Sequence, residues 1–229
     1  MGSVLGSETA PIPLTEEQAV EALQEARRRT LSLVESISDR DLERVHSTLM
    51  SPLVWDLGHI AAFEDLWLNH RFGGLQLLRE GLADIYDAFE TPRAGRGELP
   101  FLRPAEARRY LAETRARALE VIDDRGVGDG TVAELVIRHE HQHNETMLQT
   151  LQLARVDGLR FGPTAPAADG RGDLDGANGS HPRRGPRRSL SGLELIEVPA
   201  GECLLGAGPE GFAYDNERPR HRTDVRAYL

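Results

Sequence analysis

The sequence predicts a mainly α-helical protein with an N-terminal four-helix bundle. Four long segments before about residue 155 carry apolar residues at helical spacing, and the composition changes sharply after them. Four such segments are typical of a helix bundle, a fold that often holds metal ions between facing helices. We expect the bundle over residues 15–155, a flexible linker over 156–191 and a short α+β segment over 192–229.

The first two predicted helices each begin at a recognisable cap. Thr15-Glu-Glu-Gln18 has the pattern of a capping box and leads into an amphipathic run. Ser51-Pro52 offers a serine cap with proline at the first helical position. The helix that follows should run through WDLGHIAAFEDLWLNH, and because this stretch is apolar on most sides we expect it to be buried.

The third predicted helix follows Pro104, and the fourth runs from about Thr131 to Arg155. Between the second and third helices, the connection from Arg71 to Pro104 is long and contains several glycines and prolines. Connections of this length are often functional, so we expect this one to contribute to a site.

The chain after the bundle has a different character. Residues 156–191 are mostly Gly, Pro, Asp and Arg with almost nothing to bury, which is typical of a flexible linker. Beyond them, LELIEVPAGECLLGAG predicts two short strands joined at Pro199-Ala-Gly201. A segment this short does not close a core of its own, so we expect residues 192–229 to be the start of an incomplete domain.

The composition disfavours several classes of protein. All 27 Lys+Arg residues are arginine, against 37 acidic residues, and a formal net charge of −10 argues against general binding of nucleic acids. No stretch approaches the roughly 20 apolar residues of a membrane span. Because Cys203 is the only cysteine and the N-terminus lacks a secretory signal, we expect a cytoplasmic protein.

The strongest functional signal is a set of histidines at helical positions. His139 and His143 are four residues apart, so on a helix they lie on one face, and the spacing places that face toward the core. Buried imidazoles are costly unless their nitrogens are satisfied, and a metal ion satisfies them. A hydrogen-bonded pair of histidines is the alternative for these two residues alone.

A third histidine favours the metal. His59 lies in the middle of the second predicted helix, between residues that should be buried, and Gly58 beside it would allow a neighbouring helix to come close. Taken together, His59, His139 and His143 predict a three-histidine metal site inside the bundle.

HEHQH also matches the zinc-protease pattern H-E-x-x-H, with Glu140 as the general base. The extended form of that pattern requires Gly and His where this chain has Thr146 and Gln149. Families that take a glutamate ligand from a following helix need one downstream, and after Glu145 the next glutamate is Glu194, beyond the predicted linker. We therefore disfavour a metalloprotease.

Three neutral histidines would leave a divalent ion with open coordination positions. Zinc held in this way would activate a water molecule. Iron(II) would accept O2 and a second ligand together, and nitrogen ligands suit either metal. The spacing of the histidines leaves both metals open.

Two helical segments, LGHIAAFEDLW and RHEHQHNETML, resemble the metal-binding helices of the DinB-like domain in ergothioneine-biosynthesis sulfoxide synthases, also called hercynine oxygenases. The tail VPAGECLLGAG…FAYDNERPRHRTDV resembles the start of the formylglycine-generating-enzyme-like (sulfatase-modifying factor) domain that follows in that family. The resemblance covers about residues 15–155 and 192–229, and the order of the two parts is more specific than either motif.

The resemblance implies an oxidoreductase of ergothioneine biosynthesis. In that family a mononuclear non-haem iron(II), held by three histidines, uses O2 to join the thiol of γ-glutamylcysteine or cysteine to the imidazole C2 of hercynine, giving a sulfoxide. His59, His139 and His143 match the iron ligands. Arg93 and Arg96 match an arginine pair that binds the carboxylates of the thiol substrate, and Gln142 matches a glutamine that contacts hercynine; solvated surface side chains are the alternative for these three.

The chain also departs from the family. The C-terminal domain of the family is far longer, and its catalytic proton donor would lie beyond Leu229. Cys203-Leu-Leu-Gly206 stands where that domain usually has an aromatic residue followed by Met-Gly. The alternatives are a zinc-dependent thiol S-transferase of the broader DinB-like group, a catalytically impaired metal-binding fragment, and a metal-stabilised binding module without enzymatic activity.

Overall fold

The computed structural model describes residues 14–82, 84–154 and 198–228. The chain divides into a helical unit, which also includes Gly208–Asp215, and a small unit that contains the strands. The predicted linker, residues 156–191, lies outside the described residues.

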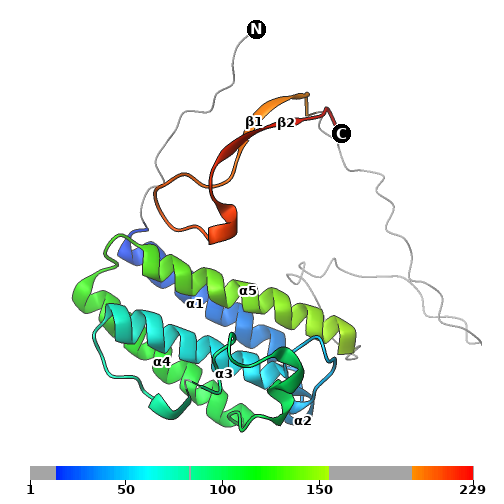
Figure 1. The fold of residues 1–229 in the computed structure, drawn as a ribbon. Coiled ribbons are helices and arrows are strands. Elements are labelled where there is room, and N and C mark those ends of the chain that lie inside the picture. The colour runs from blue at the N-terminus through cyan, green and yellow to red at the C-terminus, as the bar shows by residue number, and fades with distance from the viewer. Residues whose placement is uncertain (1–13, 83, 155–197, 229) are drawn as a thin grey trace, which may run out of the picture. The chain divides into compact units, whose positions relative to one another are not determined.

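The helical unit is a bundle of four long helices, as the sequence predicts. Helix α1 packs mainly against α5, and α3 packs against both α4 and α5 (Figure 1). The bounds of the four helices are α1 Glu16–Val34, α3 Leu53–Glu64, α4 Pro104–Arg125 and α5 Thr131–Ala154. These bounds agree with the predicted helices to within a few residues at most ends.

The start of the first helix is the predicted capping box. The Thr15 hydroxyl accepts from the backbone N–H of Gln18 at 3.2 Å, and the Gln18 side chain accepts from the backbone N–H of Thr15 at 3.0 Å. This reciprocal pair satisfies backbone donors that the first turn of a helix otherwise leaves unpaired.

The predicted second helix differs from the structure at both ends. Pro52, not Ser51, is the residue before the first helical position, and no side chain caps this helix. After Glu64 the helix widens into a π-helix, η1, over Asp65–Phe72. A short helix that the sequence analysis did not predict, α2 (Asp39–Glu43), precedes it and is capped by the hydroxyl of Ser38.

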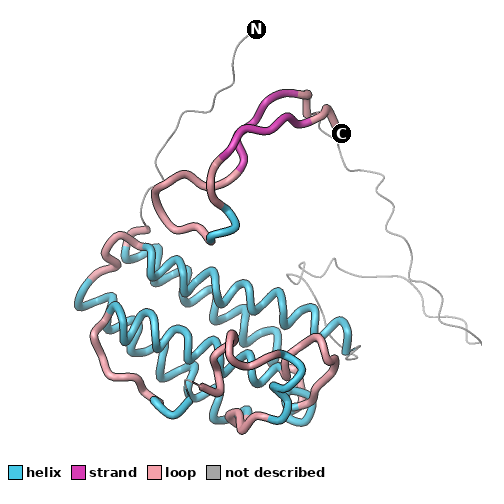
Figure 2. The backbone as a smooth tube through the Cα atoms, in the orientation of Figure 1, coloured by secondary structure: helices cyan, strands magenta, loops and turns pink. Residues whose placement is uncertain are grey.

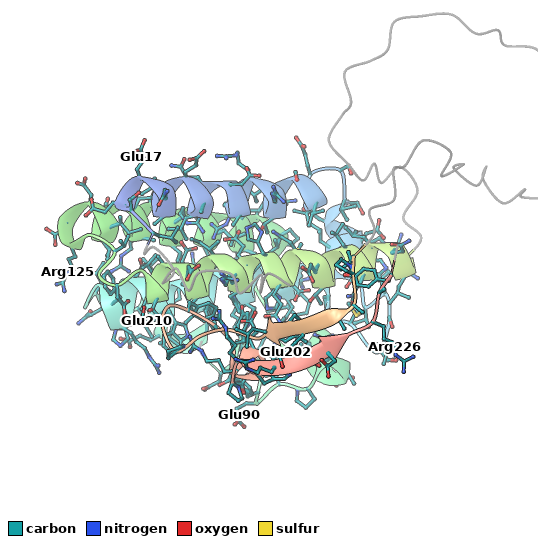
Figure 3. All side chains as sticks on the ribbon, turned by 90° about the horizontal axis from the view of Figure 1, so that it is seen from above. Glu17, Glu90, Arg125, Glu202, Glu210 and Arg226 are labelled. Atoms are coloured by element: carbon teal, nitrogen blue, oxygen red, sulfur yellow. The ribbon has the colours of Figure 1, made fainter. Side chains whose placement is uncertain are left out.

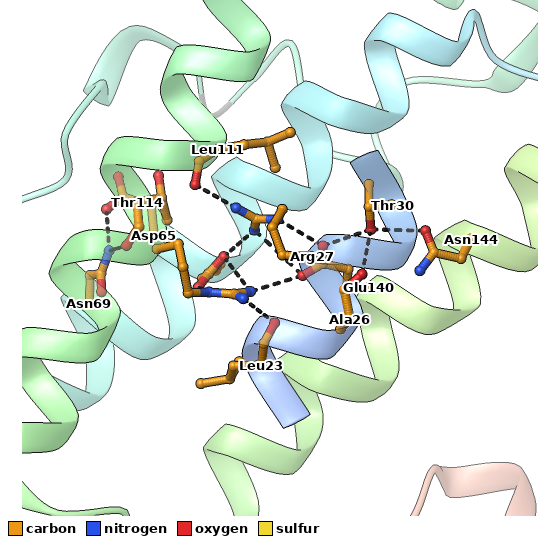
Figure 4. Close-up of polar contacts among 12 residues, drawn as sticks. Leu23, Ala26, Arg27, Thr30, Asp65, Asn69, Leu111, Thr114, Glu140 and Asn144 are labelled. Carbon is orange, nitrogen blue, oxygen red and sulfur yellow. Dashed lines mark hydrogen bonds and ion pairs between the residues drawn. The ribbon is translucent and has the colours of Figure 1, made fainter. Parts of the chain in front are cut away.

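The bundle core contains two apolar clusters. It also contains a layer of buried charged residues, which bond to one another and to neighbouring polar groups (Figure 4). Each of the four long helices contributes one charged residue to the layer: Arg27 from α1, Glu64 from α3, Arg115 from α4 and Glu140 from α5. One cluster includes Leu53, Leu57, Tyr110, Met147 and Leu151, and the other includes Leu23, Leu68, Ala118, Ile122 and Val136.

The four charged residues of this layer satisfy one another. Arg27 lies 2.6 Å from Glu64 and 2.8 Å from Glu140, and Arg115 lies 2.9 Å from Glu140 and also pairs with Glu64. The hydroxyl of Thr30 donates to Glu140 at 2.7 Å. Each carboxylate pairs with both guanidinium groups, so all four side chains are satisfied together only in one arrangement of the helices. The layer therefore fixes how the four helices are rotated relative to one another.

The long connection between η1 and α4 is mostly loop, interrupted by the short helical turns Glu80–Leu82 and Arg93–Glu98 (Figure 2). Two hydrogen bonds connect it to α3 and to the π-helix η1 that continues α3. The backbone N–H of Leu78 donates to Asp65 at 2.8 Å, and Trp55 Nε1 donates to the carbonyl of Ile85 at 3.0 Å. These bonds hold the connection close to α3.

The outer face of the bundle is charged. The side chains of Glu17, Glu90 and Arg125 are exposed and point outward (Figure 3). Within residues 14–82, 84–154 and 198–228, none of the helices combines the length and the apolar character that crossing a membrane requires.

The small unit contains two antiparallel strands, β1 (Gly201–Leu205) and β2 (His221–Val225), in a register that pairs Cys203 with Thr223. Val198 forms an isolated bridge with Tyr228. The predicted strand before Pro199 lies outside the described residues apart from Val198, and the partner of β1 is β2, from further along the chain.

Candidate metal centre

The three predicted ligand residues come together between α3 and α5. His59 lies in the middle of α3, and His139 and His143 lie one turn apart on α5. One ligand nitrogen from each of the three lies within 4.8 Å of the others, and His59 Nε2 is 3.0 Å from His139 Nε2. The helical spacing that motivated the prediction therefore produces a group that can hold one ion.

Hydrogen bonds at Nδ1 fix the orientation of two of these histidine rings. Nδ1 of His59 is 2.6 Å from the carbonyl oxygen of Tyr86, and Nδ1 of His143 is 3.1 Å from Oδ1 of Asp56. A carbonyl oxygen only accepts, so Nδ1 of His59 carries the proton. Its Nε2 is left with a lone pair for a metal.

Aromatic rings enclose the histidines. The indole of Trp55 stacks on His59 with ring centres 4.9 Å apart, and the ring of Phe63 stacks on His139 at 3.6 Å. These contacts restrict rotation of the imidazoles and remove water from one side of each ring. The site is therefore preorganised before any ion binds.

The environment keeps two of the histidines neutral. Burial, together with the nearby His143, lowers the pKa of His59 to about 3. Burial, with the neighbouring His143 and His59, also lowers the pKa of His139 well below its usual value. Because only neutral imidazole binds a metal, these shifts favour ligation near neutral pH.

The histidines face a cavity of about 780 Å³, a volume suited to small molecules. Phe63, Leu66 and Trp67 form an apolar part of its wall. The connection between η1 and α4 supplies the arginines and the aspartate of the wall, namely Arg79, Asp87, Arg93 and Arg96. The long connection thus borders the site, as its length suggested.

The predicted substrate residues also line this cavity, but their surroundings differ. Arg93 and Gln142 are exposed. Arg96 is only 5% exposed: it donates to the carbonyls of Thr91 and Ala88 and to the hydroxyl of Ser51, at 2.8–3.1 Å. Its guanidinium also lies 3.8 Å from the ring centre of Trp55, so Arg96 contributes to the wall behind His59.

Gly58 makes room for a loop residue, and the expectation that a neighbouring helix approaches it was wrong. A Cβ atom at this position would lie 2.2 Å from Cζ of Tyr86. The Tyr86 hydroxyl accepts from the backbone N–H of Leu102 at 2.9 Å, while its carbonyl accepts from His59. The glycine therefore lets Tyr86 reach α3 and hold a ligand histidine.

Glu140 is a core residue. Both of its oxygens pair with arginines in the buried charged layer, and it is not among the residues that line the cavity. Burial would by itself raise the pKa of Glu140, but Arg27 and Arg115 lower it below its usual value. This arrangement gives no support to a metalloprotease with Glu140 as general base.

Two residues that contact the candidate ligands were not predicted from the sequence. Asp56 precedes His59 by three residues, and this helical spacing was an available signal that the two share a face. The other, Tyr86, acts through its backbone carbonyl, which any residue type would provide, so no sequence signal identifies it.

Four long helices and a group of three histidines define this part of the chain as a helix bundle with a candidate metal site. A family model described as the DinB superfamily matches residues 22–147, and the chain belongs to this superfamily.

Three curated relatives are similar to nearly the whole chain, and all three are named hercynine oxygenase. The chain is 40% identical to the hercynine oxygenase of Mycolicibacterium smegmatis, over 94% of its own length and 47% of the relative. It is 41% identical to the hercynine oxygenases of Mycolicibacterium thermoresistibile and Mycobacterium tuberculosis, over 43% and 47% of those proteins. The chain thus spans about half the length of the curated relatives it matches.

Proposed function

We propose that this chain carries the metal centre of a non-haem iron(II)- and O2-dependent hercynine oxygenase of ergothioneine biosynthesis. The observation that carries the proposal is the convergence of His59, His139 and His143 at one cavity. Identity of about 40% to three proteins named hercynine oxygenase supports it. The substrates are hercynine, γ-glutamylcysteine or cysteine, and O2, and the product is a sulfoxide with a new C–S bond.

Iron(II) suits the residues that would hold it. His59, His139 and His143 would hold the ion through imidazole nitrogens, which suit iron(II). Three protein ligands would leave coordination positions open, and iron bound there would supply the redox chemistry with O2.

The chain's own residues would bind and orient the organic substrates. Arg93 is exposed at the cavity wall, and a guanidinium there pairs bidentately with the carboxylates of the thiol substrate. Arg96, the second arginine of the predicted pair, lines the same cavity and has two N–H groups beyond the three that bond Thr91, Ser51 and Ala88. Gln142, on α5 one turn before Thr146, offers both an amide donor and an acceptor to the imidazole of hercynine.

Residues 192–229 are proposed to begin the formylglycine-generating-enzyme-like part of such a protein. The strands β1 and β2 lie within this segment. The proposal rests on the motif resemblance and on the relatives, whose aligned regions cover 90–94% of the chain.

The test begins with metal content. The chain is purified without air or added metal, and iron and zinc are measured per chain. Iron near one per chain supports the oxygenase, zinc in its place supports the thiol S-transferase alternative, and no uptake of either metal contradicts both.

Activity is then assayed with hercynine, O2 and either γ-glutamylcysteine or cysteine at equal iron occupancy, with the sulfoxide detected by mass spectrometry. A His139→Ala variant is the control, because it removes one ligand and should lose both iron and product. Iron-loaded chain that neither binds the thiol nor forms product with either thiol would contradict the substrate assignment.

A further inference from the structure

Asp56 forms a contact between helices at the edge of the metal centre. It lies in the first turn of α3, is 1% exposed, and places Oδ1 3.1 Å from Nδ1 of His143 on α5. His143 also contributes a ring nitrogen to the group formed with His59 and His139, and because Nδ1 contacts Asp56, Nε2 is the nitrogen available for that role. The carboxylate is therefore on the far side of a ligand ring from the ion position.

The other oxygen of Asp56 shows that the contact to His143 is the main one. Oδ2 is buried and has no hydrogen-bond partner among the residues that the structure describes. A buried carboxylate kept only for packing would be expected to have both oxygens satisfied. Asp65 is such a case: Oδ1 accepts from Asn69, and Oδ2 accepts from the backbone N–H of Leu78.

Positive charge lies near the carboxylate of Asp56. Burial lowers the pKa of Arg96 below its usual value, and the favourable interaction of Arg96 with Asp56 opposes that shift. The first turn of α3 adds the positive end of a helix dipole. A buried anion here is thus compensated by its surroundings.

We propose that Asp56 is a positioning residue for the metal centre: its carboxylate orients His143, holds the proton on Nδ1 and strengthens Nε2 as a ligand. The inference rests on the proposed metal site and extends it to a residue that touches neither metal nor substrate. His59 has only a neutral carbonyl as its acceptor, so Asp56 gives the centre the negative charge that three neutral imidazoles lack.

The test compares Asp56→Ala and Asp56→Asn with the unmodified chain. Anaerobic competition against a chelator gives the affinity for iron(II) and cobalt(II). We expect Asp56→Ala to bind about 10–100-fold more weakly, the range typical of lost partners of metal ligands. Asp56→Asn keeps a hydrogen-bond acceptor but loses the charge. Its metal affinity should lie between that of Asp56→Ala and that of the unmodified chain.

Asp65→Asn is the matched control, because Asp65 is an equally buried carboxylate in the π-helix that continues α3, and its oxygens accept from Asn69 and Leu78. Circular dichroism checks that each variant is folded. If Asp65→Asn weakens metal binding as much as Asp56→Ala, or if Asp56→Ala binds as the unmodified chain does, the positioning role is overturned. If Asp56→Asn matches the unmodified chain, the role of the charge is overturned.

A second measurement needs no variant. In the zinc-loaded chain with ¹⁵N-labelled histidine, NMR should find the proton of His143 on Nδ1 and the metal on Nε2. The opposite tautomer contradicts the proposal. An unmodified chain that binds no divalent metal at all contradicts the proposed function itself, and the two failures are thus distinguishable.

Discussion

At the scale of single residues, Arg93 and Arg96 have different partners although they lie three positions apart on one loop. Arg93 is exposed, and its contact to the carbonyl of Leu49 is long, at 3.4 Å. Arg96 is buried, and its hydrogen bonds hold the loop together behind Trp55. Substitution of each should therefore affect a different property.

Arg93→Ala should leave the free energy of unfolding within about 0.5 kcal/mol of the original, as at other surface positions, and should weaken binding of γ-glutamylcysteine about tenfold or more. Arg96→Ala leaves buried carbonyls unpaired and should cost roughly 2–4 kcal/mol. Denaturant unfolding and calorimetric titration of the metal-loaded chain measure the two effects. Equal loss of stability in both variants would contradict the separate roles.

The low pKa of His59 makes the metal-free chain sensitive to acid. Burial lowers this pKa to about 3, whereas the unfolded chain has the ordinary value of 6.5. Between these values the unfolded state binds the proton and the folded state does not, so stability falls as pH decreases from about 6.5 toward 3.

The loss from His59 should be on the order of a few kcal/mol, measured by urea unfolding of chelator-treated protein at a series of pH values. His59→Asn cannot titrate, and its stability should fall less over the same range. Parallel pH profiles for the two chains would refute this explanation.

At the scale of elements, the contact between α3 and the loop depends on Gly58. Gly58→Ala places a Cβ atom within 2.5 Å of three atoms at the hydroxyl end of Tyr86, so either the Tyr86 side chain or the helix must move. We expect a loss of about 1–3 kcal/mol from overpacking, together with weaker metal binding because Tyr86 also holds His59.

Gly95→Ala is the control for this substitution, because a Cβ atom there has no atom within 4 Å. Thermal unfolding and metal titration report both effects. Equal behaviour of the two alanine variants would show that the close approach of Tyr86 is unimportant.

The buried charged layer connects all four long helices. Replacing one of its charged residues leaves the partners of that residue without an ion pair. Glu140→Gln should destabilise the chain by about 3–5 kcal/mol, because Arg27 and Arg115 would each lose a buried partner. Glu25→Gln removes two exposed ion pairs on α1 and should have a much smaller effect on stability. Denaturant unfolding separates these cases, and a small effect for Glu140→Gln would mean that the layer does not stabilise the packing.

At the scale of the whole molecule, the candidate metal centre lies within the helical bundle. The three histidines and the partners of their Nδ1 atoms, Asp56 and Tyr86, all lie within residues 14–154. A chain of residues 1–155 should therefore bind one metal ion per chain, as the 229-residue chain should.

Elemental analysis and chelator competition on both forms test this expectation. Circular dichroism confirms that the shorter chain retains its helices. A folded 1–155 chain with much weaker metal affinity would show that residues beyond the bundle contribute to the centre.

The sequence by itself determined the helices and the candidate ligands. Thr15 and Gln18 form the cap that their spacing predicts, and His139 and His143 share a face because four residues make about one helical turn. These signals act within one or two turns of the chain, so they can be read without knowing its path in space. The clear exceptions were the start of α3 and the π-helix after Glu64.

Only the tertiary structure decided which partners the site residues have. Asp56 and His143 are 87 positions apart, Arg96 and Ser51 are 45 apart, and the carbonyl that aims His59 comes from a loop. The pairing of β1 with β2 likewise depends on a segment further along the chain. Contacts of this kind depend on how the helices and loops pack, and packing is a property of the whole core that no local pattern specifies.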